Sequence, residues 1–125
     1  MPILDIEVVL AGELDIDSTW AQRIADASGK IFGTKPGRTW VRVRKLQLSD
    51  YAENGTELAP DLHPIFVSVL KSQLPPVDRL RAESQELTSE IARIVGRQTE
   101  NVHILYLPPA AERMSFGGTL VEKAN

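Results

Sequence analysis

Pro2 is the residue whose type and position offer the most chemistry in this sequence. Removal of an initiator methionine would leave proline at the amino terminus as a secondary amine, and the reference pKa of an α-amino group is about 8. Burial and nearby cations both disfavour the charged amine and lower its pKa. An amine with a pKa near neutrality is suited to abstract a proton next to a carbonyl group. Alternatively, Pro2 only begins an edge strand, where no backbone donor is needed.

A basic cluster is the second candidate for chemistry. In a protein whose net charge is −3, it consists of Lys35, Arg38, Arg42, Arg44 and Lys45. In an extended strand Arg42 and Arg44 point to the same side as Trp40, because side chains alternate between the two faces. Such a group can bind a carboxylate and stabilise a developing enolate. Alternatively, it is a solvated strand face or a surface that contacts another subunit.

The tail contains a third candidate, the segment Met114-Ser115-Phe116-Gly117-Gly118-Thr119-Leu120. Glycines allow the backbone to turn tightly, and the ring of Phe116 can form the wall of a pocket. The same segment also fits a hairpin whose edge packs on a neighbouring subunit. The two interpretations are compatible.

Several common chemistries are excluded by residue type or spacing. The chain has no cysteine, which excludes disulfides, thiolate metal sites and a cysteine nucleophile. Its two histidines, His63 and His103, do not have the spacing of a metal site. Neither a phosphate-binding loop nor a Gly-x-Ser-x-Gly motif occurs. We therefore expect no cofactor and no metal.

Composition and hydropathy indicate one soluble domain. The chain has 125 residues, of which 42% are hydrophobic and 25% charged, as in ordinary globular domains. The charge provides no basic surface typical of a nucleic-acid partner, and no apolar run reaches the length of about 18 residues that a membrane span needs. The amino terminus lacks the pattern of a signal peptide. We expect a cytoplasmic protein that acts on a small molecule or on another protein.

The elements that must position these residues follow a strand–helix–strand order that occurs twice. Runs of branched apolar residues predict strands at 2–10, 39–48, 64–70 and 102–107. Helical spacing predicts two helices, at about 18–33 and about 75–96, each ended by a glycine. Asp17 or Ser18 is expected to cap the first helix. Polar residues and an Asn-Gly pair indicate a surface loop or a small hairpin at 50–63.

The two halves look like copies of one unit, because Pro2-Ile3 and 39–43 correspond to Pro64-Ile65 and 100–104 at nearly the same offset. A β-α-β crossover is right-handed and places its two strands parallel. We therefore predict an α+β fold in which duplicated β-α-β units form a four-stranded mixed sheet with two helices on one face. The opposite face, with Leu, Val and Trp side chains and no helix over it, predicts self-association. The single domain at 1–125 is expected to divide into a repeat at about 2–49, a connecting loop at 50–63, a second repeat at about 64–107 and a tail at 108–125.

The amino-terminal proline, the duplicated units and the Phe-Gly-Gly tail resemble the tautomerase superfamily. This superfamily includes 4-oxalocrotonate tautomerase (4-OT), macrophage migration inhibitory factor (MIF), the chloroacrylic acid dehalogenases and malonate semialdehyde decarboxylase. The resemblance covers the whole chain, which has the length of the fused, two-repeat members. It implies a tautomerase/MIF-like fold, cofactor-independent isomerase activity and a homotrimer. Each chain would hold one site, because Pro64 follows His63 within the chain and has no free amine.

Individual residues carry this resemblance. Pro2 falls on the family's catalytic amino-terminal proline, and Arg42 is similar to the substrate-binding arginine of 4-OT. Lys35, followed by a proline, is similar to the pocket lysine of MIF. Phe116 is similar to the phenylalanine that lines the 4-OT active site, and Tyr106 to pocket tyrosines of the longer members. The resemblance therefore implies that Pro2 and Arg42 are catalytic.

Two positions depart from the family pattern. Gly12-Glu13 stands where 4-OT has an arginine after its first strand. After the third strand, where the dehalogenases and the decarboxylase have two arginines, this sequence has a single cationic residue, Lys71. The substrate would be held by Lys35, Lys71, Tyr106 and Phe116.

The expected function is keto–enol tautomerisation of a small anionic carboxylate, a 2-oxo or enol acid, with Pro2 as general acid and base. One alternative is a dehalogenase, hydratase or decarboxylase of the same superfamily, in which a carboxylate such as Glu112 positions water. Another alternative is a non-catalytic trimeric binding or signalling module. If Met1 is retained, Pro2 is an ordinary peptide proline and cannot act as the amine base.

Overall fold

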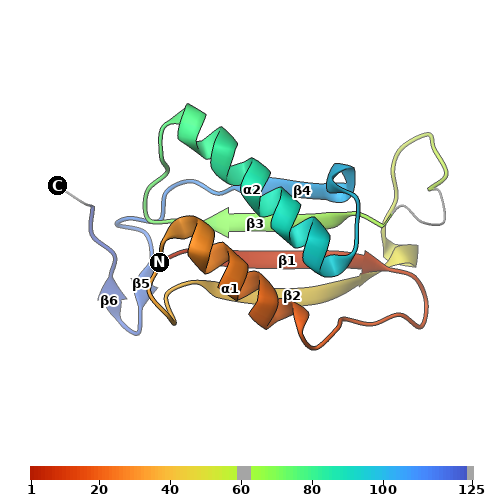
Figure 1. The fold of residues 1–125 in the computed structure, drawn as a ribbon, viewed down its shortest axis with the longest axis horizontal. Coiled ribbons are helices and arrows are strands. Elements are labelled where there is room, and N and C mark those ends of the chain that lie inside the picture. The colour runs from red at the N-terminus through yellow and green to blue at the C-terminus, as the bar shows by residue number, and fades with distance from the viewer. Residues whose placement is uncertain (59–62, 124–125) are drawn as a thin grey trace.

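The computed structural model describes residues 1–58 and 63–123 as an α+β fold (Figure 1). Residues 59–62 of the predicted loop and 124–125 of the predicted tail lie outside the described residues. Two β-α-β units are followed by a small hairpin. The elements are β1 (Ile3–Leu10), α1 (Trp20–Phe32), β2 (Trp40–Gln47), β3 (Ile65–Leu70), α2 (Val77–Val95), β4 (Val102–Tyr106), β5 (Ser115–Phe116) and β6 (Thr119–Leu120), with short 3-10 turns at Leu48–Asp50 and Thr99–Asn101.

The main sheet has the strand order β2-β1-β3-β4. Each β-α-β unit contributes one parallel pair, β1 with β2 and β3 with β4, and the two units join through the antiparallel pair β1 and β3. The predicted four-stranded mixed sheet is therefore confirmed. The central strand β1 is buried along most of its length because both of its edges are paired and its Leu4, Ile6 and Val8 face the core.

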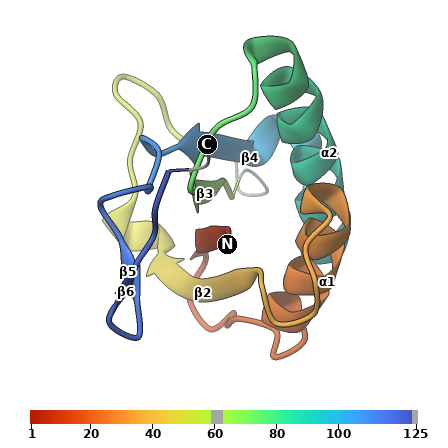
Figure 2. The same cartoon turned by 90° about the vertical axis from the view of Figure 1, so that its left-hand side faces the viewer.

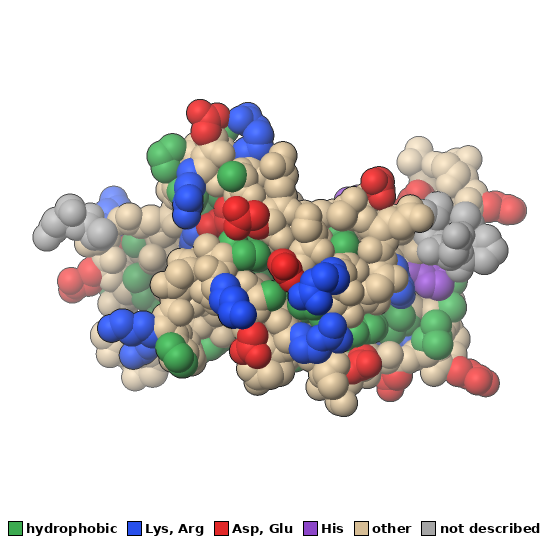
Figure 3. Space-filling model, viewed as in Figure 1, with side chains coloured by type: hydrophobic (Ala, Val, Ile, Leu, Met, Phe, Trp, Pro, Cys, Tyr) green, Lys and Arg blue, Asp and Glu red, His purple; other side chains and the backbone are tan. Residues whose placement is uncertain are grey.

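Both helices cover the same face of the sheet, as Figure 2 shows from the end. Their apolar sides bury Ile24 of α1 and Leu87 and Ile91 of α2 against the sheet, which forms one core. Their outer sides carry interspersed basic and acidic side chains (Figure 3). None of the helices among the described residues is long and apolar enough to cross a membrane.

The start of α1 differs from the expected cap. Its first residue is preceded by Thr19, and no side chain caps the helix. Instead, the Asp17 carboxylate accepts hydrogen bonds from the Thr19 backbone N–H at 2.7 Å and from the Thr19 hydroxyl at 2.6 Å. Asp17 therefore stabilises the turn before the helix, and these hydrogen bonds lower the pKa of its carboxyl group.

The face without helices is less apolar than predicted. Arg42 of β2 forms an ion pair with Asp5 of β1 at 2.6 Å, and Arg44 of β2 lies 3.6 Å from Glu7 of β1. These pairs arise because β2 and β1 run parallel and place Arg42 opposite Asp5 and Arg44 opposite Glu7. Large apolar side chains are still exposed in the sheet, with Trp40 at 44% and Leu105 at 61%. The face is thus a mixture of apolar side chains and paired charges.

Candidate active site

Pro2 lies at the amino end of the central strand, where the two neighbouring strands place other side chains beside it. It is buried, and its carbonyl oxygen accepts a hydrogen bond from the Trp40 backbone N–H at 3.0 Å. Ile3 pairs with Leu70 of β3, so Lys71 follows at the position next to Pro2. Since Leu4 faces the helices, the alternation of β1 directs Pro2 to the same helix-facing side.

The terminal amine at this place is in an environment that disfavours its charged form. Here the amine belongs to Met1, and the pKa of that amine is lowered by burial first and then by the positive charges of Lys71 and Arg38. The two cations come from different elements, one after β3 and the other from the turn before β2. The surroundings of the amino terminus are therefore those that favour a neutral amine.

Lys71 and Tyr106 meet at one carboxylate, that of Glu83 in α2. The Lys71 ammonium lies 2.7 Å from one oxygen of Glu83, and the Tyr106 hydroxyl donates to the other oxygen at 2.9 Å. Glu83 is 7% exposed, and the Lys71 nitrogen also lies 4.8 Å from the centre of the Phe32 ring. Burial and the hydrogen bond to Glu83 raise the pKa of Tyr106, so its hydroxyl stays protonated.

Phe116 reaches the same end of the sheet from the β5–β6 hairpin. Its ring packs edge-on against Trp40 with 5.2 Å between the ring centres. The Trp40 indole N–H in turn donates to the Gly37 carbonyl at 3.0 Å, which fixes the ring beside the turn that carries Lys35. Phe116 therefore forms an aromatic wall together with Trp40.

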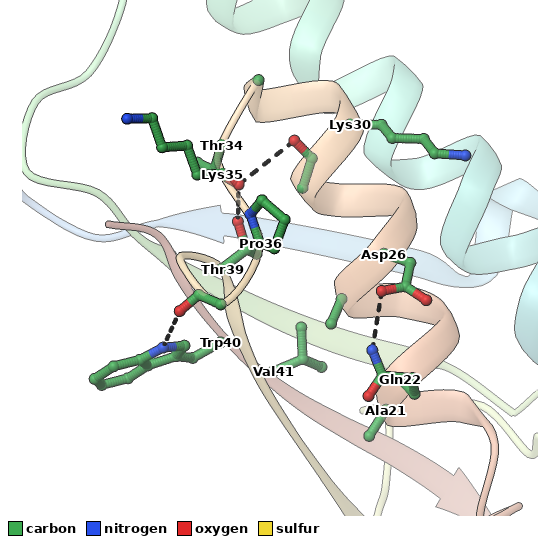
Figure 4. A pocket seen from close by; sticks show the side chains of 14 residues that line it. Ala21, Gln22, Asp26, Lys30, Thr34, Lys35, Pro36, Thr39, Trp40 and Val41 are labelled. Carbon is green, nitrogen blue, oxygen red and sulfur yellow. Dashed lines mark hydrogen bonds between the residues drawn. The ribbon is translucent and has the colours of Figure 1, made fainter.

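Lys35 lies on an exposed turn between α1 and β2, in which the Arg38 backbone N–H donates a hydrogen bond to the Lys35 carbonyl at 3.1 Å. The turn borders an open groove of about 900 Å³ along α1, lined in part by Gln22, Asp26 and Trp40 (Figure 4). Pro2, Lys71 and Tyr106 do not line this groove. The groove is therefore adjacent to the amino-terminal site and distinct from it.

Arg42 is not brought to Pro2 of its own chain. Its side chain lies on the face without helices, where its Nε and Nη2 atoms donate to the two oxygens of Asp5 at 2.6 and 2.8 Å. The hydrogen bond to Asp5 raises the pKa of the Arg42 guanidinium. Within one protomer, Arg42 and Pro2 therefore point to opposite faces of the sheet.

Glu112 lies in the turn before the hairpin in a left-handed conformation with φ of 67°. Its backbone N–H donates to the Val121 carbonyl at 2.6 Å, and its carboxylate lies 3.8 Å from the Lys123 ammonium. The carboxylate is thus exposed at the start of the tail. Among the residues that the structure describes, no group of three or more His, Asp or Glu side chains could hold a metal ion.

The sequence analysis missed one residue of this site, Glu83, and did not place Arg38 beside the terminal amine. Glu83 lies in the apolar stripe of α2 between Leu80 and Leu87, and a carboxylate at a buried position of a helix is the signal that points to it. Arg38 was noticed only as one member of the basic cluster, because its proximity to the terminal amine depends on how the turn before β2 folds back.

The sequence matches no protein-family model and no curated protein. Solved structures do match over nearly the whole chain. A fused 4-OT described as a symmetric trimer superposes with a TM-score of 0.77 at 13% identity, over 95% of this chain and 94% of its own. The chain has the fold of the tautomerase superfamily. The resemblance in fold is therefore confirmed, at low sequence identity.

Two other solved structures with this fold, a MIF and a decarboxylase, also match the chain. MIF from Oncomelania hupensis matches with a TM-score of 0.72 at 18% identity, over 97% of this chain and 82% of its own. A malonate semialdehyde decarboxylase inhibited by 3-bromopropiolate matches with a TM-score of 0.69 at 16% identity, over 92% of this chain and 88% of its own. At such identities the likeness concerns the fold, and the chemistry must be argued from the side chains at the site.

Proposed function

We propose that this protein belongs to the tautomerase superfamily and is a cofactor-independent keto–enol tautomerase of a small 2-oxo or enol carboxylic acid. The proposal takes Met1 as an initiator residue that is removed, which makes Pro2 the terminal amine. The observation that carries it is the burial of Pro2 at the amino end of β1, where Lys71 and Arg38 act on the terminal amine.

In this mechanism the neutral Pro2 amine removes a proton from the carbon next to the substrate carbonyl and returns it at another position. The positive charges of Lys71 and Arg38 favour the neutral form of the amine and attract the anionic substrate. Among the described residues no ion pair occupies Arg38 or Lys35, so both cations are available for a carboxylate. Phe116 and Tyr106 would limit the space for the substrate.

We also propose that the protein acts as a homotrimer. The exposed apolar side chains of Trp40, Leu105 and Leu120 support association, and a fused 4-OT with a similar structure is a trimer. Arg42 keeps its proposed role only in such an assembly. Because its side chain lies on the uncovered face, it would bind the substrate carboxylate at the site of a neighbouring protomer.

The first test is the intact mass of the natively produced protein. Loss of one methionine residue is expected, and a titration of the resulting amine by NMR should then give a pKa below the usual value of about 8. A retained methionine would contradict the proposal and favour the non-catalytic alternative.

The second test is turnover of phenylpyruvate and 2-hydroxymuconate by the processed protein. The Pro2→Ala variant replaces the secondary ring amine by a primary amine and should lower kcat, since general acid–base catalysis depends on the position and pKa of the base. If the processed protein converts neither compound, the tautomerase proposal fails. Release of CO2 from a 3-oxo acid without isomerisation would favour the decarboxylase alternative.

A further inference from the structure

Glu83 is the most deeply buried carboxylate among the described residues, at 7% exposure within the apolar side of α2. Both of its oxygens are occupied, one by the Lys71 ammonium and the other by the Tyr106 hydroxyl. Burial of an isolated carboxylate is strongly unfavourable, so this placement depends on both partners. An apolar residue would fill the same position of the core without that cost.

The hydrogen bonds determine what each partner can still offer. Tyr106 donates its only hydroxyl proton to Glu83, which leaves lone pairs of its oxygen for any other contact. Lys71 has three donors and uses one for Glu83, while the face of the Phe32 ring lies 4.8 Å away. Lys71 follows β3 and lies beside the amino end of β1, and the Glu83 carboxylate also offsets its positive charge there.

We propose that Glu83 is a positioning residue of the Pro2 site, which holds the Lys71 ammonium beside the terminal amine and directs the Tyr106 hydroxyl proton away from the substrate. Tyr106 then presents an acceptor, and the substrate group beside it is a donor such as an enol hydroxyl. This inference rests on the proposed function and deepens it, because it names the polarity of the substrate group that Tyr106 contacts.

The charged groups around the amine come from several elements. Lys71 follows β3, Arg38 lies in the turn before β2, Glu83 belongs to α2 and Tyr106 ends β4, while α1 contributes the uncharged Phe32 ring. Among these groups Glu83 is the carboxylate. Loss of its charge therefore leaves Lys71 without its counter-charge and should shift proton release from the amine to lower pH.

The test variant is Glu83→Gln, and its matched control is Glu90→Gln, which makes the same change in an exposed ion pair of the same helix with Arg93. Titration by NMR should show a lower pKa of the terminal amine in Glu83→Gln and no change in the control. The Gln amide can donate to Tyr106, so the hydroxyl proton is released toward the substrate. For Glu83→Gln we expect a lower kcat and an acid limb of the pH–rate profile that lies at lower pH than in the wild type. The control Glu90→Gln should show wild-type kinetics.

An unchanged amine pKa in folded Glu83→Gln would overturn the inference, because a residue that only packs the helix has no effect on that titration. If Glu83→Gln does not fold, the double variant Glu83→Gln/Lys71→Met leaves no buried unpaired charge. Its amine should titrate at higher pH than the wild type, and a pKa at or below the wild-type value would overturn the inference. The pKa of the terminal amine can be measured by NMR whether or not the protein is active. If the wild type shows no turnover, the proposed function is refuted, and the titration of Glu83→Gln still tests the role of Glu83.

Discussion

Replacement of Lys71 by methionine should destabilise the protein far more than an ordinary surface change. The substitution leaves the Glu83 carboxylate, which is 7% exposed, with only the Tyr106 hydroxyl as partner. Loss of one partner of a buried ion pair costs about 3–5 kcal/mol. The Lys71 side chain is 17% exposed and the Tyr106 bond remains, so we expect the lower end, about 3 kcal/mol.

The assay is urea unfolding at neutral pH and fixed protein concentration, because the stability of an oligomer depends on concentration. With a slope of about 2 kcal/mol per molar urea, the midpoint for Lys71→Met should fall by about 1.5 M. The matched control Arg93→Met leaves Glu90, which is 39% exposed, without its partner. Its cost should stay below about 1 kcal/mol, since water replaces the lost partner.

Two outcomes decide whether this reasoning holds. The double variant Lys71→Met/Glu83→Leu removes the stranded carboxylate and should recover most of the lost stability. If Lys71→Met costs no more than Arg93→Met, the buried ion pair does not contribute as argued. If the double variant is no more stable than Lys71→Met, the cost arises from lost packing and the electrostatic argument is wrong.

Three further predictions follow from individual contacts. The hydrogen bond to Glu53 raises the pKa of Tyr51 to about 12, and burial raises that of Tyr106, so ultraviolet titration of the folded protein should show little phenolate at pH 10. The stabilisation by Tyr51 is then complete below pH 10 and is lost as the pH rises through about 12. Arg38→Ala should raise the pKa of the terminal amine, measured by NMR, because a nearby cation is lost. Gly96→Ala should lower the free energy of unfolding by about 1 kcal/mol, since Gly96 ends α2 with φ of 75°; an equal midpoint in urea would contradict this.

Much of the fold was predictable because local patterns and one chirality rule determine it. The alternation of Leu4, Ile6 and Val8 indicates a strand with one face in the core, and the spacing of Leu87 and Ile91 indicates a helix with one buried side. Right-handed crossovers then give parallel pairs within each unit. Local patterns do not determine how the two β-α-β units join. The duplication favoured an edge-to-edge arrangement of their strands, and the structure has this arrangement.

The parts that were not predictable depend on contacts between distant segments. The pairing of Asp5 with Arg42 follows from the strand register, which no local pattern fixes. The uncovered face is less apolar than predicted for this reason, because the charged residues of β1 and β2 were not matched with each other. Glu83 was missed because its partners lie 12 and 23 residues away in sequence, beyond the reach of helical spacing.

The charge ladder between β1 and β2 has a consequence for any surface that covers it. Asp5 with Arg42 and Glu7 with Arg44 each cancel within one chain, so these four side chains contribute no net charge to that side of the sheet. Coulombic repulsion between identical copies therefore does not oppose contact through it, and desolvation of already neutralised pairs is the main electrostatic penalty. Assembly through this side should accordingly respond weakly to ionic strength.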